Sequence, residues 1–145
     1  MSEQKSKVQE LEEKLQAKRD ERAKAEEAQY EKDLEARIDL EEEHGTIAHV
    51  KVARFSPGQP THAYLRTPSA VEYKRYKAMM FAANGQKNKS KAQQDAQEQL
   101  ARACWVYPAP DAQEAMLEKF PGLLTPLSMA AAALAEGAAE SEGKD

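Results

Sequence analysis

The chain has 145 residues and a net charge of −4, with 32% charged and 41% hydrophobic residues. A mean hydropathy of −0.82 is too polar for the whole chain to share one globular core. The single cysteine, Cys104, excludes an intrachain disulfide, and the longest apolar run, 130–135, is far shorter than the roughly 18 residues of a membrane span. We therefore expect a cytoplasmic protein with one compact domain, an extension and no membrane partner.

The charge is unevenly distributed along the chain. Residues 1–44 contain 9 basic and 15 acidic side chains, residues 45–91 contain 9 and 1, and residues 92–145 contain 3 and 9. A basic middle block can bind nucleic acid, but the acidic ends of the chain or an acidic protein partner could equally neutralise it.

The first 44 residues read as one long helix. Residues 3–43 contain neither Pro nor Gly and consist almost entirely of good helix formers, and Gly45 is a plausible stop. Apolar residues recur at helical spacing only near the two ends: Val8, Leu11 and Leu15, then Tyr30, Leu34 and Ile38. Because a stable coiled coil sustains its seam over about three heptads, we interpret 1–44 as a solvated, partly coiled-coil arm, with 8–38 as a candidate surface for self-association.

After the arm, the sequence changes from helix-forming to strand-forming residues. Residues 46–55 and 61–66 are rich in strand formers, and the Pro and Gly residues of 56–60 predict a loop between them. Together they predict a β-hairpin whose register the imperfect alternation leaves open.

Four short helices are predicted beyond the hairpin. Three of them start at capping residues or prolines: Thr67-Pro68 for 67–83, Asp111 for 111–120, and Thr125-Pro126 for 125–135. The remaining one, 91–106, follows the polar loop 84–90. We expect an α+β, predominantly helical fold with a domain over 45–137 and a flexible acidic tail over 138–145.

The usual catalytic and metal-binding residues are few. His44 lies at a helix end, while His49 and His62 lie on the two predicted strands and could approach each other. Two histidines without a nearby Cys or a clear carboxylate pair make a poor zinc site, and Cys104 in an apolar setting reads as a buried core residue. We expect no metal, no cofactor and no enzymatic activity.

One cluster in the basic block is the candidate partner-binding site. It consists of aromatic and cationic residues on and after one helix: Tyr73, Lys74, Arg75, Tyr76, Lys77, Phe81, Lys87 and Lys89. Interleaved rings and cations can stack on nucleic acid. Alternatively, Tyr73, Met80 and Phe81 face the core while the cations are solvated, or the helix docks an acidic, helical protein.

Two stretches resemble a known family. Residues 65–73 (LRTPSAVEY) have an Arg-x-Pro-Ser junction between a strand and a helix, and residues 100–108 (LARACWVYP) precede 117–121 (LEKFP). In these stretches the chain is similar to small tail assembly chaperones of tailed bacteriophages and prophages, over about residues 46–136. The resemblance implies a non-enzymatic protein that binds the long helical tape-measure protein and helps to recruit tube subunits.

The function predicted from the sequence is therefore that of a phage or prophage tail assembly chaperone with a protein partner, acting in the host cytoplasm. Two alternatives stay open: a nucleic-acid-binding accessory protein using residues 73–91, and a structural component of a virion or injection apparatus.

Overall fold

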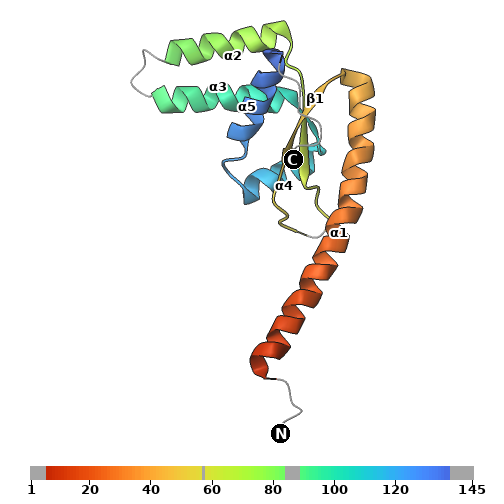
Figure 1. The fold of residues 1–145 in the computed structure, drawn as a ribbon. Helices are drawn as coiled ribbons and strands as arrows, with labels where there is room; N and C mark the ends of the chain where they lie inside the picture. The colour runs from red at the N-terminus through yellow and green to blue at the C-terminus, as the bar shows by residue number, and fades with distance from the viewer. Residues whose placement is uncertain (1–5, 57, 84–88, 138–145) are drawn as a thin grey trace.

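A computed structural model describes residues 6–56, 58–83 and 89–137 of the chain (Figure 1). The elements follow in the order α1 (Lys7–His44), β1 (Ile47–Lys51), β2 (His62–Arg66), α2 (Ala70–Ala83), α3 (Lys89–Cys104), β3 (Trp105–Tyr107), α4 (Pro110–Lys119) and α5 (Leu124–Ala135). This is the α+β, predominantly helical fold that we predicted, with its long N-terminal helix, hairpin and four shorter helices. The predicted tail over 138–145 lies outside the described residues.

Helix α1 is about 57 Å long at 1.5 Å per residue, and about half of it extends past the rest of the molecule (Figure 1). Ser6 and Gln9 cap its start reciprocally, at 3.1 and 3.0 Å between side chain and backbone. Gly45 ends it with a φ of +79°, a conformation that L side chains rarely adopt, which explains the predicted stop at this position.

The hairpin strands pair antiparallel, with Ile47 opposite Arg66 and Lys51 opposite His62. This register separates two faces of the sheet. Ala48, Val52 and Leu65 belong to the apolar core, whereas His49, His62 and Tyr64 make contacts on the α1 side. Both faces are covered, so the more polar face of the hairpin, with His62 and Tyr64, is buried against α1 instead of facing solvent.

The prediction that the helix continues to residue 106 is wrong, because α3 ends at Cys104. Residues 105–107 form β3, which pairs with β2 through Trp105 opposite Leu65 and Tyr107 opposite Tyr64. Trp and Tyr favour strands locally, and the sheet edge at β2 provides hydrogen-bond partners that the chain meets only in three dimensions.

Three predicted caps are also wrong in detail. Ser69, not Thr67, caps α2, because Ser69 Oγ accepts from the Glu72 N–H at 3.1 Å and the Glu72 carboxylate accepts from the Ser69 N–H at 2.9 Å. Helix α4 begins at Pro110 after Ala109, without a side-chain cap, and α5 begins at Leu124. Asp111 and Thr125 therefore lie inside the first turns of these helices.

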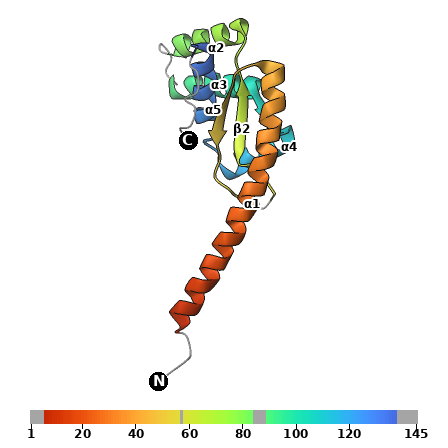
Figure 2. The same cartoon turned by 45° about the vertical axis from the view of Figure 1, so that its right-hand side comes forward.

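The apolar core lies between the sheet and helices α3, α4 and α5. Its most enclosed members include Leu65, Leu100, Cys104, Met116 and Leu127. Helix α1 covers the opposite face of β1 and β2 (Figure 2). No helix in the described part of the chain is long and apolar enough to cross a membrane.

Candidate functional site

The most unusual side chain of α1 is Asp33, whose exposed fraction is 0% in an otherwise solvated, charged helix. Tyr107 Oη and Gln29 Nε2 donate to its Oδ1 at 2.5 and 3.0 Å. The Thr61 N–H and Thr61 Oγ1 donate to Oδ2 at 3.3 and 3.4 Å, and His62 Nδ1 lies 3.2 Å from the same oxygen. Tyr64 Oη also donates to the Asp33 backbone carbonyl at 2.9 Å. This one acid therefore joins α1 to β2 and β3.

The hydrogen bonds decide the protonation state of Asp33. Burial by itself raises the pKa of the carboxyl, but the donors from His62, Tyr107, Gln29 and Thr61 together lower it below its ordinary value. Burial and the bond to Asp33 raise the pKa of Tyr107, so its phenol stays protonated and continues to donate. The buried acid is thus a stable carboxylate at neutral pH.

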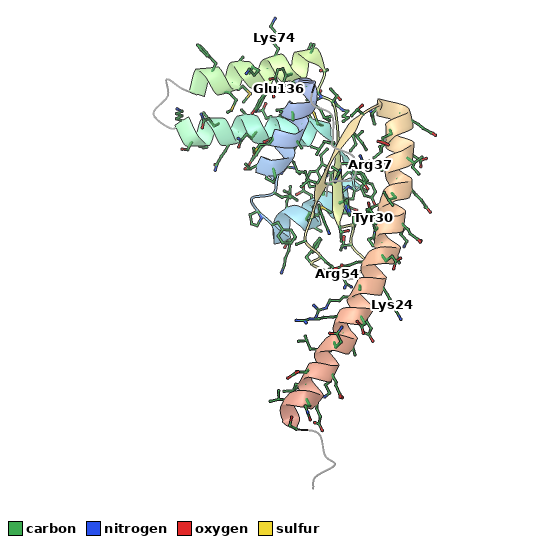
Figure 3. All side chains as sticks on the ribbon, in the orientation of Figure 1. Lys24, Tyr30, Arg37, Arg54, Lys74 and Glu136 are labelled. Carbon is green, nitrogen blue, oxygen red and sulfur yellow. The ribbon has the colours of Figure 1, made fainter. Side chains whose placement is uncertain are left out.

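Aromatic and cationic side chains extend this network towards solvent. The Tyr30 ring lies 4.9 Å from the His62 ring between centroids, and the His49 and His62 rings are 6.2 Å apart, so the predicted approach of the two histidines is confirmed. Arg37 lies over the Tyr64 ring at 5.9 Å, with its Nη1 3.3 Å from His49 Nδ1. Tyr30 and Arg37 extend from α1 towards the strands (Figure 3).

These side chains line an open cleft of about 840 Å³ between α1 and the hairpin. Its charged members are Arg37, Lys51 and Arg54 against Glu26 and Glu27. A second hollow of about 750 Å³ adjoins it, since Glu26 and Arg54 line both. The second hollow continues along α1 past Lys18 and Arg22.

Arg54 lies where the two hollows meet, between the hairpin loop and α1 (Figure 3). Its Nη1 atom is enclosed and has no hydrogen-bond partner among the described residues. Enclosed polar atoms are nearly always hydrogen-bonded in folded proteins, so this nitrogen needs an explanation.

The projecting half of α1 carries an exposed apolar row consisting of Val8, Leu11 and Leu15. Leu15 precedes the buried Asp33 by 18 residues, which is about five turns, so the two lie on the same face of the helix. The same spacing relates Leu11 to Gln29. The row is therefore a continuation, beyond the domain, of the helix face that docks on the sheet.

The predicted site on α2 is divided in the structure. Tyr73 donates to Glu136 at 2.7 Å, and Tyr76 packs partly against the core. The cations Lys74, Arg75, Lys77 and Lys89 are exposed, and Figure 3 shows Lys74 pointing away from the domain; Lys87 lies outside the described residues.

The predicted alternative in which Tyr73, Met80 and Phe81 all face the core is wrong for Phe81. This side chain is 80% exposed, whereas Tyr73 and Met80 are partly covered. One residue advances the direction of a helical side chain by about 100°, so Phe81 cannot share the direction of Met80.

The residues that carry the family resemblance form a structural junction. The Arg66 guanidinium holds Glu72 through two bonds of 2.8 Å and donates to the Ala103 carbonyl at 2.7 Å. Arg66 lowers the pKa of Glu72 to about 2. Cys104 is buried, as predicted, and burial raises its thiol pKa to about 11, which keeps it in the unreactive protonated form.

Sequence reasoning missed Asp33, because it is one of 15 acidic residues in the first 44 and nothing local distinguishes it. It also treated the carboxylates of α1 as solvated, which is wrong for this residue. Among the described residues, no group of three or more His, Cys, Asp or Glu side chains is arranged to hold a metal ion. No protein-family model, curated protein or solved structure matches the chain.

Proposed function

We propose that this protein is a non-enzymatic assembly factor that binds a helical client protein along the projecting half of α1. The observation that carries the proposal is the exposed row of Val8, Leu11 and Leu15 on the docking face of the helix. Single exposed apolar residues are common on protein surfaces, but three at a spacing of three and four residues form a stripe that a partner helix can cover.

Within this class, we propose a phage or prophage tail assembly chaperone whose client is the tape-measure protein or a tube subunit. The Arg66-Thr67-Pro68-Ser69 junction and the 100–121 segment, which resemble that family, support the proposal. The fold would act in the host cytoplasm by covering an apolar stripe of a client that otherwise aggregates.

A candidate tape-measure fragment tests the proposal in a titration against the wild-type protein and a Leu11→Asp variant. We expect wild-type binding and a loss of about tenfold or more in the variant, because the aspartate places a charge in an apolar interface. Ile38→Asp is the matched control: Ile38 and Leu11 are 58% and 52% exposed, but Ile38 lies on another face of α1. Equal loss in both variants, or none in either, would contradict the proposed surface.

Nucleic acid is the alternative partner, favoured by the exposed cations of α2 and by Phe81. Single- and double-stranded oligonucleotides, titrated over a salt series, separate the two functions. Phosphate contacts make affinity fall steeply with salt, whereas apolar docking changes little. Tight, salt-steep oligonucleotide binding without affinity for the fragment would replace the chaperone proposal.

The pairing of Asp33 with His62 makes enzymatic activity worth a direct test. The orientation of a histidine by a buried carboxylate occurs in hydrolases, but here the same acid is occupied by four further donors that join structural elements. We propose that hydrolase and transferase assays yield no turnover. A rate that disappears in His62→Ala would refute this.

A further inference from the structure

The two hollows beside α1 contain more positive than negative side chains, although the whole chain has a net charge of −4. Five cations line them against three acids. The cations are Lys18, Arg22, Arg37, Lys51 and Arg54, and the acids are Glu21, Glu26 and Glu27. The negative charge of the nearby Asp33 is already compensated by its own hydrogen bonds. The hollows are therefore a basic groove on a chain that is acidic overall.

The groove begins where the apolar row ends. Leu15 and Lys18 are one helical turn apart, so the row leads directly into the second hollow and then, past Arg54, into the cleft. A helix lying along the row would thus extend over the groove, and the part beyond its apolar contacts would meet cations.

Within the groove, Arg37 already has side-chain partners, whereas Arg54 has no ion-pair partner among the described residues. Arg37 contacts His49 and Glu41, its Nε lying 3.6 Å from a Glu41 carboxylate oxygen. In the described part of the chain, neither Arg54 nor Lys51 has an ion-pair partner, and Arg54 has an enclosed nitrogen without any hydrogen bond. Arg54 as a whole is partly exposed and lines both hollows, so a carboxylate that enters the groove can pair with its positive charge.

We propose that this groove binds the acidic segment of an amphipathic client helix, with Arg54 and Lys51 as the cations that meet its carboxylates. The inference rests on the proposed function and adds the chemical class of the client: apolar residues spaced three and four apart, followed by Asp or Glu residues. The apolar row supplies contact area, while the groove selects charge and orientation.

Three synthetic helical peptides test this on the full-length protein by fluorescence anisotropy. All carry the same leucines in one half; the other half has glutamates, glutamines or lysines. We expect the glutamate peptide to bind about tenfold tighter than the glutamine peptide, as a charge-assisted hydrogen bond of about 1.4 kcal/mol requires, and the lysine peptide to bind weakest.

Variants of the protein locate the contact. Arg54→Gln should weaken the glutamate peptide about tenfold and leave the glutamine peptide unchanged, because removal of either partner breaks the same interaction. Arg75→Gln, which removes an exposed arginine on α2, is the matched control and should change neither affinity. The melting temperature of Arg54→Gln should equal that of the wild type, which shows that the variant is folded.

The outcomes distinguish the groove from the row. If Leu11→Asp abolishes glutamate-peptide binding while Arg54→Gln does not weaken it, the client surface on α1 stands and the acid-binding groove is overturned. Absence of glutamate-peptide binding at millimolar concentration overturns it as well. A third result would also overturn it: the protein sediments as a dimer, and both Leu11→Asp and Arg54→Gln abolish the dimer. The occupant of the groove would then be a second copy of this chain.

Discussion

The two halves of α1 have similar compositions and different surroundings. Both are highly charged and lack Pro and Gly. In the half nearer the hairpin, Asp33 is enclosed by donors from β2 and β3, and Arg37 lies over Tyr64. In the projecting half, Val8, Leu11 and Leu15 are exposed. Local propensity makes both halves helical, but only the half that contains Asp33 has partners on the sheet.

This docking relies largely on polar contacts. The face of α1 that covers the sheet presents an amide, a carboxylate and a guanidinium beside the partly covered Ala36 and Leu40, while Leu34 and Ile38, which point in other directions, are exposed. Polar networks fix geometry well, yet removal of one partner is costly because the others are left enclosed and unsatisfied.

The largest expected effect is that of deleting residues 1–44. If the helix were only a solvated arm, the melting temperature of the remaining domain would hardly change. Because α1 covers one face of β1 and β2 and contributes the whole Asp33 network, we expect a fall of more than about 20 °C, equivalent to about 5 kcal/mol or more in a domain of this size. Deletion of residues 1–17 should leave the melting temperature nearly unchanged, and calorimetry of the two truncations compares the halves directly. Equal effects would show that the projecting half also packs on the domain.

Asp33→Ala should produce the next largest loss. It leaves the Tyr107, His62 and Thr61 donors enclosed without their acceptor, and breaking a buried charged network costs about 3–5 kcal/mol. Urea unfolding measures the loss. Asp39→Ala, which removes an exposed aspartate on the same half of the helix, is the matched control and should change stability by less than about 0.5 kcal/mol. A loss below about 1 kcal/mol for Asp33→Ala would mean that the network does not hold the helix.

The pH dependence of stability sharpens the same contrast. Asp33 has a pKa below its ordinary value in the folded protein, so its contribution is complete above the unfolded pKa of about 3.9 and is lost as pH falls through the lower folded pKa. Glu72, whose pKa is about 2, adds a loss of the same sign over about pH 4.5 to 2.

We therefore expect the wild-type unfolding free energy to fall by about 1–3 kcal/mol between pH 5 and pH 2.5. The double variant Asp33→Asn/Glu72→Gln should show a flatter profile in the same urea titrations. Glu114→Gln, which removes the exposed partner of Arg102, should keep the wild-type slope. A double variant as steep as the wild type would assign the acid sensitivity to other groups.

The smallest stability effect is expected in the projecting half. Leu15→Ser should change the unfolding free energy by less than about 0.5 kcal/mol, because the side chain is exposed and contributes to no core. The same substitution should weaken client binding. The projecting half would then contribute to binding and not to stability, whereas the half with Asp33 contributes to stability. A measurable loss of stability in dilute protein would instead indicate that the row already packs on something, a second copy included.

Much of the fold follows from local sequence. The uninterrupted helix formers before Gly45, the strand formers on each side of 56–60 and the prolines before the later helices predicted the elements, because each acts within a few residues. Local signals also placed Cys104 in the core. The prediction of helix caps was wrong where two candidates lay close together, as with Thr67 and Ser69. The geometry of the preceding strand decides between them.

The candidate site needed the tertiary structure. The sequence by itself determined that α1 is a helix, that a basic block follows it and that apolar residues lie near its tip. It did not determine that Asp33, among many similar acids, meets Tyr107 from a position 74 residues away, or that Arg54 opens onto a groove beside the helix. The physical reason is that a buried charge is selected by partners that only folding brings together, whereas helix and strand preferences depend on neighbours in the chain.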